Sequence, residues 1–209
     1  MEIIRRKGHR LREFNEALRA ARAFLEIADT FFAALPGLMK RDPDYARKTR
    51  SQLIAAATNL AFGVELYLKT LLMATGSKVP TGRNGHNLLV LFEALTPETR
   101  TSLELFYQKR MQASGPLKEV RVYVTSRSNL SDAERVQEEA KLVSGDDLQS
   151  VLTSEKDAFQ SWRYFYEAAN ATIALYRIKV RALYAVANAV DDHFNLPKTV
   201  ASPDADRRG

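Results

Sequence analysis

The strongest constraint in this sequence is a long run of apolar residues at helical spacing between residues 44 and 75. Its apolar positions recur every three or four residues, which places them on one side of an α-helix. They are Leu53, Ala57, Leu60, Val64, Leu68 and Leu71. Gly76 follows the run at the position where a left-handed C-cap is favoured. We therefore predict a long helix over about 44–75 whose apolar side is buried against other helices.

Similar spacing predicts helices along most of the remaining chain. The expected helices cover about 11–35, 86–95, 96–111 and 154–194. Pro36-Gly37 is expected to end the first of these, and Thr96-Pro97 to begin the third. Together the helices predict an all-α fold, an up-and-down bundle of four to five helices that forms a single domain over residues 11–196.

Residues 114–145 interrupt the helical pattern. Val120, Val122 and Val124 alternate with polar residues, which indicates an extended segment. Ser131 and Glu134 have the spacing of a capping box, which predicts the start of a short polar helix. We interpret 114–145 as a short irregular insertion on the bundle, because it is too short and too polar to bury a core of its own. The tail, residues 197–209, has no periodicity and is expected to be disordered.

The composition excludes several classes of protein. No apolar stretch is long enough to span a bilayer, and no apolar leader follows the N-terminus, so a cytoplasmic location is expected. The absence of cysteine excludes disulfides, thiolate metal sites and a cysteine nucleophile. The three histidines have no metal-ligand spacing, and the common phosphate-loop, dinucleotide and nucleophile-elbow motifs are missing. We therefore expect no metal or organic cofactor.

The net charge of +6 is concentrated at one end of the chain. Residues 1–12 hold five basic side chains and one acidic one, a local balance of +4 that leaves +2 for the rest. This pattern predicts a basic N-terminal arm over residues 1–10. Two interpretations of the arm stay open: a solvated terminus, or an arm that binds phosphate groups.

Glu65 is a candidate binding residue because it lies beside the apolar stripe of the 44–75 helix. A carboxylate in that position needs a partner or a proton. Lys69, one helical turn further on, would form an ion pair with it. In the alternative interpretation, Arg163 joins Glu65 in a polar network between helices.

Arg163 is a second candidate, since it lies in the aromatic run Trp162-Arg163-Tyr164-Phe165-Tyr166. A guanidinium group stacks on aromatic faces and grips carboxylates with two hydrogen bonds. Arg163 is therefore either an arginine at the edge of the core, held by Glu65 or Glu93, or a contact to a nucleotide or RNA. In the second case Tyr166 is expected to take part in binding.

The loop Arg83-Asn84-Gly85-His86 carries the candidate catalytic pair, Arg83 and His86. Backbone amides at a helix start attract phosphate, and Asn84 adds a polar side chain beside them. Arg83 would then hold the phosphate while His86 moves a proton, as RNA cleavage without a metal requires. The alternative is that His86 is only an N-cap or packing residue of the short helix that follows.

Three segments in this order resemble the HEPN superfamily (higher eukaryotes and prokaryotes nucleotide-binding domains). They are the apolar helix with Glu65 and Lys69, the Gly85-His86-x-Leu88 start of the next helix, and the aromatic run around Arg163. The resemblance covers about residues 45–195. It implies a helical bundle, a homodimer, and in many members metal-independent cleavage of RNA in toxin–antitoxin, phage-defence or RNA-processing systems.

The active motif of that superfamily is an arginine followed by a polar residue, with four to six residues before a histidine. Here only two residues separate Arg83 from His86. The resemblance therefore implies, first, a dimeric module that binds RNA or a nucleotide. A divergent endoribonuclease using Arg83 and His86 is the alternative, and a helical adaptor that binds another protein through 114–145 is a third.

Overall fold

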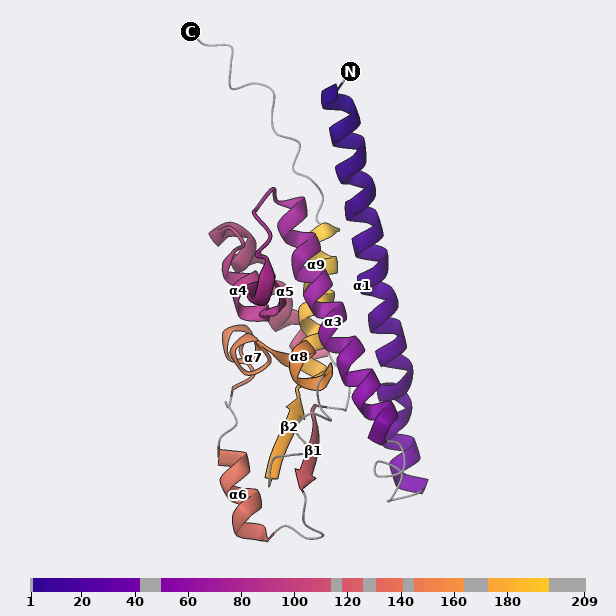
Figure 1. Ribbon diagram of the computed structural model, residues 1–209, viewed down its shortest axis with the longest axis vertical. Helices are drawn as coiled ribbons and strands as arrows, with labels where there is room; N and C mark the ends of the chain where they lie inside the picture. Colours follow the sequence, from indigo (N-terminus) through magenta and orange to yellow (C-terminus); the bar gives the residue numbers. More distant parts are fainter. Residues whose placement is uncertain are drawn as a thin grey trace.

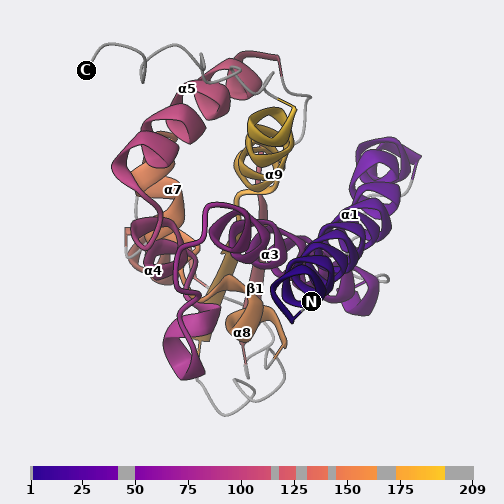
Figure 2. The same cartoon turned by 90° about the horizontal axis from the view of Figure 1, so that it is seen from above.

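The computed structural model describes residues 2–41, 50–113, 118–125, 131–140, 145–163 and 173–195. It is mostly helical, with packed helix pairs and one small two-stranded sheet, which confirms the predicted helical bundle with a short insertion. Helix α3 lies at its centre, and α1, α4, α8 and α9 surround it (Figures 1 and 2). Among the described residues, no helix is both long and apolar enough to cross a membrane.

The longest element is α1 (Glu2–Arg41), which runs alongside α3 (Arg50–Ala74) (Figure 1). It begins at Glu2 rather than near Leu11, although its first eleven side chains lie outside the described ones. The expectation that Pro36 ends this helix is wrong, because Pro36 lies inside it. A proline removes one backbone hydrogen bond from a helix. Here the burial of Phe32 and Leu35 immediately before it offsets that cost.

The α3 helix ends as predicted, at a glycine with a positive φ angle. Gly76 has a φ of 72°, and the N–H of Ser77 donates to the carbonyl of Leu72 over 2.9 Å. Gly76 donates to the carbonyl of Met73 over 3.3 Å, which completes a Schellman motif. The start predicted for this helix, near residue 44, lies outside the described residues.

A 3₁₀ turn and two helices follow α3: η1 (Gly82–His86), α4 (Leu88–Glu93) and α5 (Pro97–Ala113). The Oδ1 atom of Asn87 accepts from the N–H of Val90 over 3.1 Å, so Asn87 is the N-cap of α4. The interpretation of His86 as that cap is therefore wrong. The hydroxyl of Thr96 accepts from the N–H of Thr99 over 3.3 Å, which confirms the predicted start of α5.

The insertion contributes strand β1 (Val120–Thr125) and helix α6 (Asp132–Ala140). The strand confirms the extended segment inferred from the alternating valines. The capping box is also present, since Ser131 and Glu134 exchange side-chain and backbone hydrogen bonds of 2.7–3.3 Å.

The prediction of one long helix over 154–194 is wrong. This part of the chain holds the end of α7 (Leu148–Ser154), then α8 (Ala158–Arg163), strand β2 (Ile173–Ile178) and α9 (Val180–Phe194). Strand β2 pairs with β1 in antiparallel register, with Val120 opposite Ile178 and Thr125 opposite Ile173. The apolar residues of Ile-Ala-Leu-Tyr-Arg-Ile satisfy a strand as well as a helix, and the backbone partner in β1 decides between them.

Ion pairs at the end of α9 attach this helix to the rest of the bundle. Asp191 accepts from Arg22 of α1 and from the hydroxyl of Tyr67 of α3, both over 2.7 Å. Asp192 accepts two hydrogen bonds from Arg110 of α5, of 2.5 and 2.7 Å. Hydrogen bonds to charged groups are among the stronger ones, so these contacts help to fix α9 between α1, α3 and α5.

Candidate functional site

A fully buried carboxylate lies at the centre of the candidate site. Glu65, on α3, has no exposed surface, and the sequence surrounds it with apolar neighbours. The ion pair expected with Lys69 is present, at 2.7 Å between Nζ and Oε1. The Nδ1 atom of His86 also lies 3.1 and 3.2 Å from the two carboxylate oxygens. The cost of burying the charge is thus offset by two partners.

The η1 turn positions His86 above this carboxylate. Gly85 is buried in the turn, and a Cβ there would lie 2.9 Å from the carbonyl oxygen of Pro80, so only glycine allows this close approach. The backbone N–H of Leu88 donates to the carbonyl of Lys156 over 2.9 Å, which ties the turn to the segment between α7 and α8. The His86 side chain remains 40% exposed, so it is reachable from solvent.

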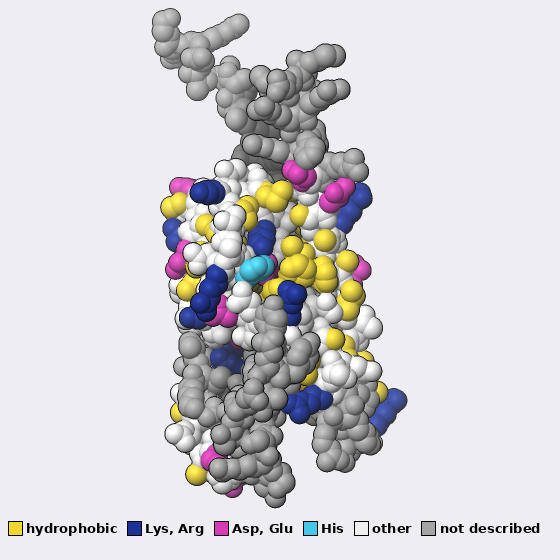
Figure 3. Space-filling view, viewed as in Figure 1, with side chains coloured by type: hydrophobic (Ala, Val, Ile, Leu, Met, Phe, Trp, Pro, Cys, Tyr) yellow, Lys and Arg dark blue, Asp and Glu magenta, His cyan; other side chains and the backbone are white. Residues whose placement is uncertain are grey.

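Aromatic rings form one wall of the site. Phe159 of α8 lies 5.9 Å from the His86 ring, centroid to centroid, and stacks on Phe62 of α3 at 4.7 Å. The guanidinium carbon of Arg163 lies 5.7 Å from the centre of the Phe159 ring, within the range of a cation–π contact. Figure 3 shows one face of the molecule, on which a histidine lies among lysine or arginine side chains and next to hydrophobic ones.

Of the other predicted site residues, two lie on η1 beside His86, and one is not described by the structure. Arg83 and Asn84 are exposed on η1, and a 3₁₀ turn places residues three apart, such as Arg83 and His86, on the same side. Tyr166 lies outside the described residues. Among those that are described, no group of three His, Asp or Glu side chains is placed to hold a metal ion.

We name the set Glu65, Lys69, His86, Phe159 and Arg163 the histidine cluster. The sequence indicated four of its members but not Phe159, which lies in the segment predicted as one long helix over 154–194. Its position four residues before Arg163, on the same side of a helix, was the available signal.

Comparisons with known proteins give no match: no protein-family model, no curated protein and no solved structure matches this chain. The function proposed below therefore depends on the geometry of the histidine cluster and on the sequence motifs within it.

Proposed function

We propose that this chain is an RNA- or nucleotide-binding module of the HEPN type, and that the histidine cluster is its binding surface. The observation that carries the proposal is the exposed edge of His86, held by a buried carboxylate beside a cation stacked on an aromatic ring.

The cluster combines the two kinds of group that a nucleotide needs. Arg163, and beside the cluster Arg83 on η1, are exposed cations suited to phosphate oxygens, and Phe159 offers an apolar ring to a base or ribose. Lys69 is 23% exposed and adds a third positive charge, although Glu65 offsets part of its field. The surface is therefore positive with an aromatic component, the combination found where single-stranded nucleic acids bind.

A specific observation also favours cleavage of RNA as a second candidate function. An ionised carboxylate only accepts hydrogen bonds, so Glu65 fixes the proton of neutral His86 on Nδ1 and leaves Nε2 as a proton acceptor. Nε2 would take the proton of a ribose 2′-hydroxyl, whose oxygen then attacks the adjacent phosphorus. The bond to the 5′-oxygen breaks, that oxygen gains a proton from solvent, and a cyclic phosphate forms.

Binding is tested by fluorescence anisotropy of a labelled single-stranded RNA at low and moderate salt. Arg163→Gln should weaken binding by about tenfold, because it removes a stacked phosphate-binding cation. Lys109→Gln removes the same charge from an exposed position on α5 and is the matched control. Equal losses in the two variants, or no binding at low salt, would refute the proposed surface.

Cleavage is tested by incubating the same RNA with the protein in EDTA and resolving the products. The second candidate predicts a product with a cyclic phosphate end, lost in His86→Asn and retained in Lys109→Gln. If the RNA binds but stays intact, the binding proposal stands and the nuclease proposal is refuted.

A further inference from the structure

The turn that carries His86 is attached to the junction between α7 and α8. The backbone N–H of Leu88, which follows the turn, donates to the carbonyl of Lys156 in this junction over 2.9 Å. The junction leads directly into α8, whose Phe159 ring lies 5.9 Å from the His86 ring, centroid to centroid. A backbone hydrogen bond and a ring contact therefore make the position of the histidine depend on the position of the junction.

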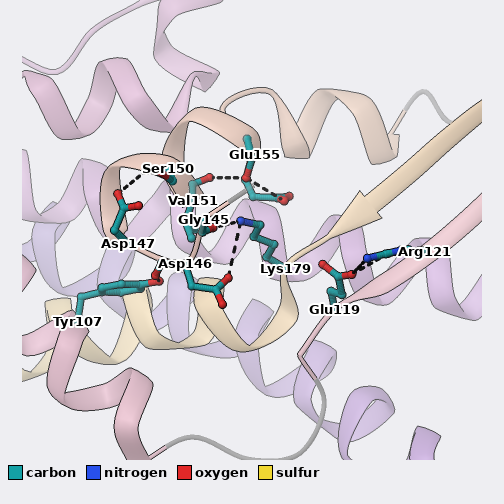
Figure 4. A network of polar contacts seen from close by, with 11 residues as sticks. Tyr107, Glu119, Arg121, Gly145, Asp146, Asp147, Ser150, Val151, Glu155 and Lys179 are labelled. Carbon is teal, nitrogen blue, oxygen red and sulfur yellow. Dashed lines mark hydrogen bonds and ion pairs between the residues drawn. The ribbon is translucent and has the colours of Figure 1, made fainter. Parts of the chain in front are cut away.

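Glu155 is the buried residue of this junction, at 3% exposure, and it directly precedes Lys156 in the chain. It is the C-cap of α7, and its backbone N–H donates to the carbonyl of Val151 over 2.9 Å (Figure 4). Its own carbonyl accepts from the N–H of Ala158, the first residue of α8, also over 2.9 Å. Because Glu155 joins the two helices in this way, a displacement of Glu155 also moves the carbonyl of Lys156.

Two cations act on the carboxyl of Glu155. The backbone N–H of Lys179 donates a hydrogen bond to it, and the charges of Arg177 and Lys179 favour its ionised form. The ammonium of Lys179 also donates to the carbonyl of Gly145 and lies 3.8 Å from a carboxylate oxygen of Asp146 (Figure 4). Lys179 is thus shared between Glu155 and a second carboxylate, which limits how far it can stabilise a negative charge on Glu155.

The effect of burial on Glu155 is larger than the effect of these cations. Burial raises the pKa of its carboxyl from 4.5 to about 7, so the carboxyl is neutral below that pH and ionised above it. An ionised carboxylate at this depth requires water or a closer cation. Either adjustment displaces the junction, because the backbone of Glu155 is bonded to the helices on both sides.

We propose that Glu155 is a positioning residue that regulates the histidine cluster, and that RNA binds there more weakly when Glu155 is ionised. This inference rests on the proposed RNA-binding function of the cluster. Ionisation displaces the junction, the carbonyl of Lys156 moves away from Leu88, and the turn no longer holds His86 beside Phe159. Since binding and ionisation are coupled, bound RNA in turn favours the protonated form of Glu155.

Fluorescence anisotropy of a labelled single-stranded RNA at about pH 6 and about pH 8 tests this regulation. Across this interval the native chain should lose about tenfold in affinity beyond any loss in Glu155→Gln, because glutamine cannot ionise. Ionisation of other groups, His86 included, affects both chains alike, so the difference between them belongs to Glu155. Glu104→Gln, which removes an exposed carboxylate from α5, is the matched control and should behave as the native chain does.

The backbone amide of Leu88 gives a second readout that needs no RNA. At about pH 8 its hydrogen should exchange with solvent faster in the native chain than in Glu155→Gln, because the hydrogen bond to Lys156 opens more often. Arg177→Gln is the second variant if Glu155→Gln fails to fold. It removes a cation that lowers the pKa of Glu155, so the loss of RNA affinity should move to higher pH.

The two readouts separate this inference from the proposed function. Equal pH dependence of RNA binding in the native and Glu155→Gln chains, with equal exchange of the Leu88 amide, would overturn the regulation and leave the binding surface standing. Absence of RNA binding at both pH values would refute the proposed function, while the amide exchange still decides whether Glu155 controls the turn.

Discussion

Replacing Glu155 by glutamine should make the protein more stable at alkaline pH and change its stability less in acid. Glu155 is 3% exposed, and burial raises the pKa of its carboxyl from 4.5 to about 7, against the lowering effect of Arg177 and Lys179. The folded state therefore holds the proton more tightly than the unfolded chain. The resulting stability is complete below about pH 4.5 and is lost as the pH rises through about 7.

The size of the effect follows from the same two pKa values. Between about pH 5 and about pH 8, the native chain should lose about 2 to 3 kcal/mol of unfolding free energy through Glu155 alone. Glutamine is neutral at both pH values and can still accept the hydrogen bond from the N–H of Lys179. The stability of Glu155→Gln relative to the native chain should therefore rise by this amount across the interval.

Urea unfolding followed by the fluorescence of Trp162 provides the assay, because this single tryptophan is 1% exposed. Glu104→Gln, on the exposed side of α5, makes the same charge change as a control and should show no such difference between the two pH values. If Glu155→Gln changes the stability equally at both, the carboxyl is not protonated preferentially in the folded state and the reasoning is wrong.

Two further substitutions test the packing of α1 against its neighbours. Gly63→Ala should destabilise the fold by about 1 to 3 kcal/mol in urea unfolding, since the new Cβ would lie 3.1 Å from Cγ of Leu25; unchanged stability would contradict this close helix contact. Asp191→Asn should cost about 1 to 3 kcal/mol, because the amide has one acceptor oxygen: either Arg22 or Tyr67 loses its acceptor, and the other keeps only a neutral one. A thermal unfolding midpoint equal to the native one would show that these hydrogen bonds are dispensable.

The parts of the fold that could be predicted were those fixed by local chemistry. The glycine after α3, the threonine before α5 and the Ser131–Glu134 pair each satisfy backbone groups within a few residues. Strand β2 could not be predicted in this way, because its partner lies far earlier in the chain: 48 residues separate Thr125 from Ile173, and 58 separate Val120 from Ile178. The spacing of apolar residues within one segment does not reveal a strand partner so far away in the sequence.

The same distinction applies to the candidate site: a contact within one helix could be predicted, and a contact between distant segments could not. Glu65 and Lys69 are one turn apart on one helix, so their ion pair followed from spacing. The contact of His86 with Glu65 depends on a turn held by Pro80 and Lys156, which joins segments far apart in the sequence.

The pairing of β1 with β2 also bears on how the histidine cluster is assembled from separate parts of the chain. The two strands bring residues 125 and 173 together, so the excursion between them begins and ends at one place. That excursion carries α8, with Phe159 and Arg163, while Glu65 and His86 belong to the chain before it. Lys156, on the same excursion, accepts the N–H of Leu88 and so also holds the turn that carries His86. The two parts of the histidine cluster are thus coupled through a backbone hydrogen bond, so the later part of the chain cannot be exchanged without affecting the turn that carries His86.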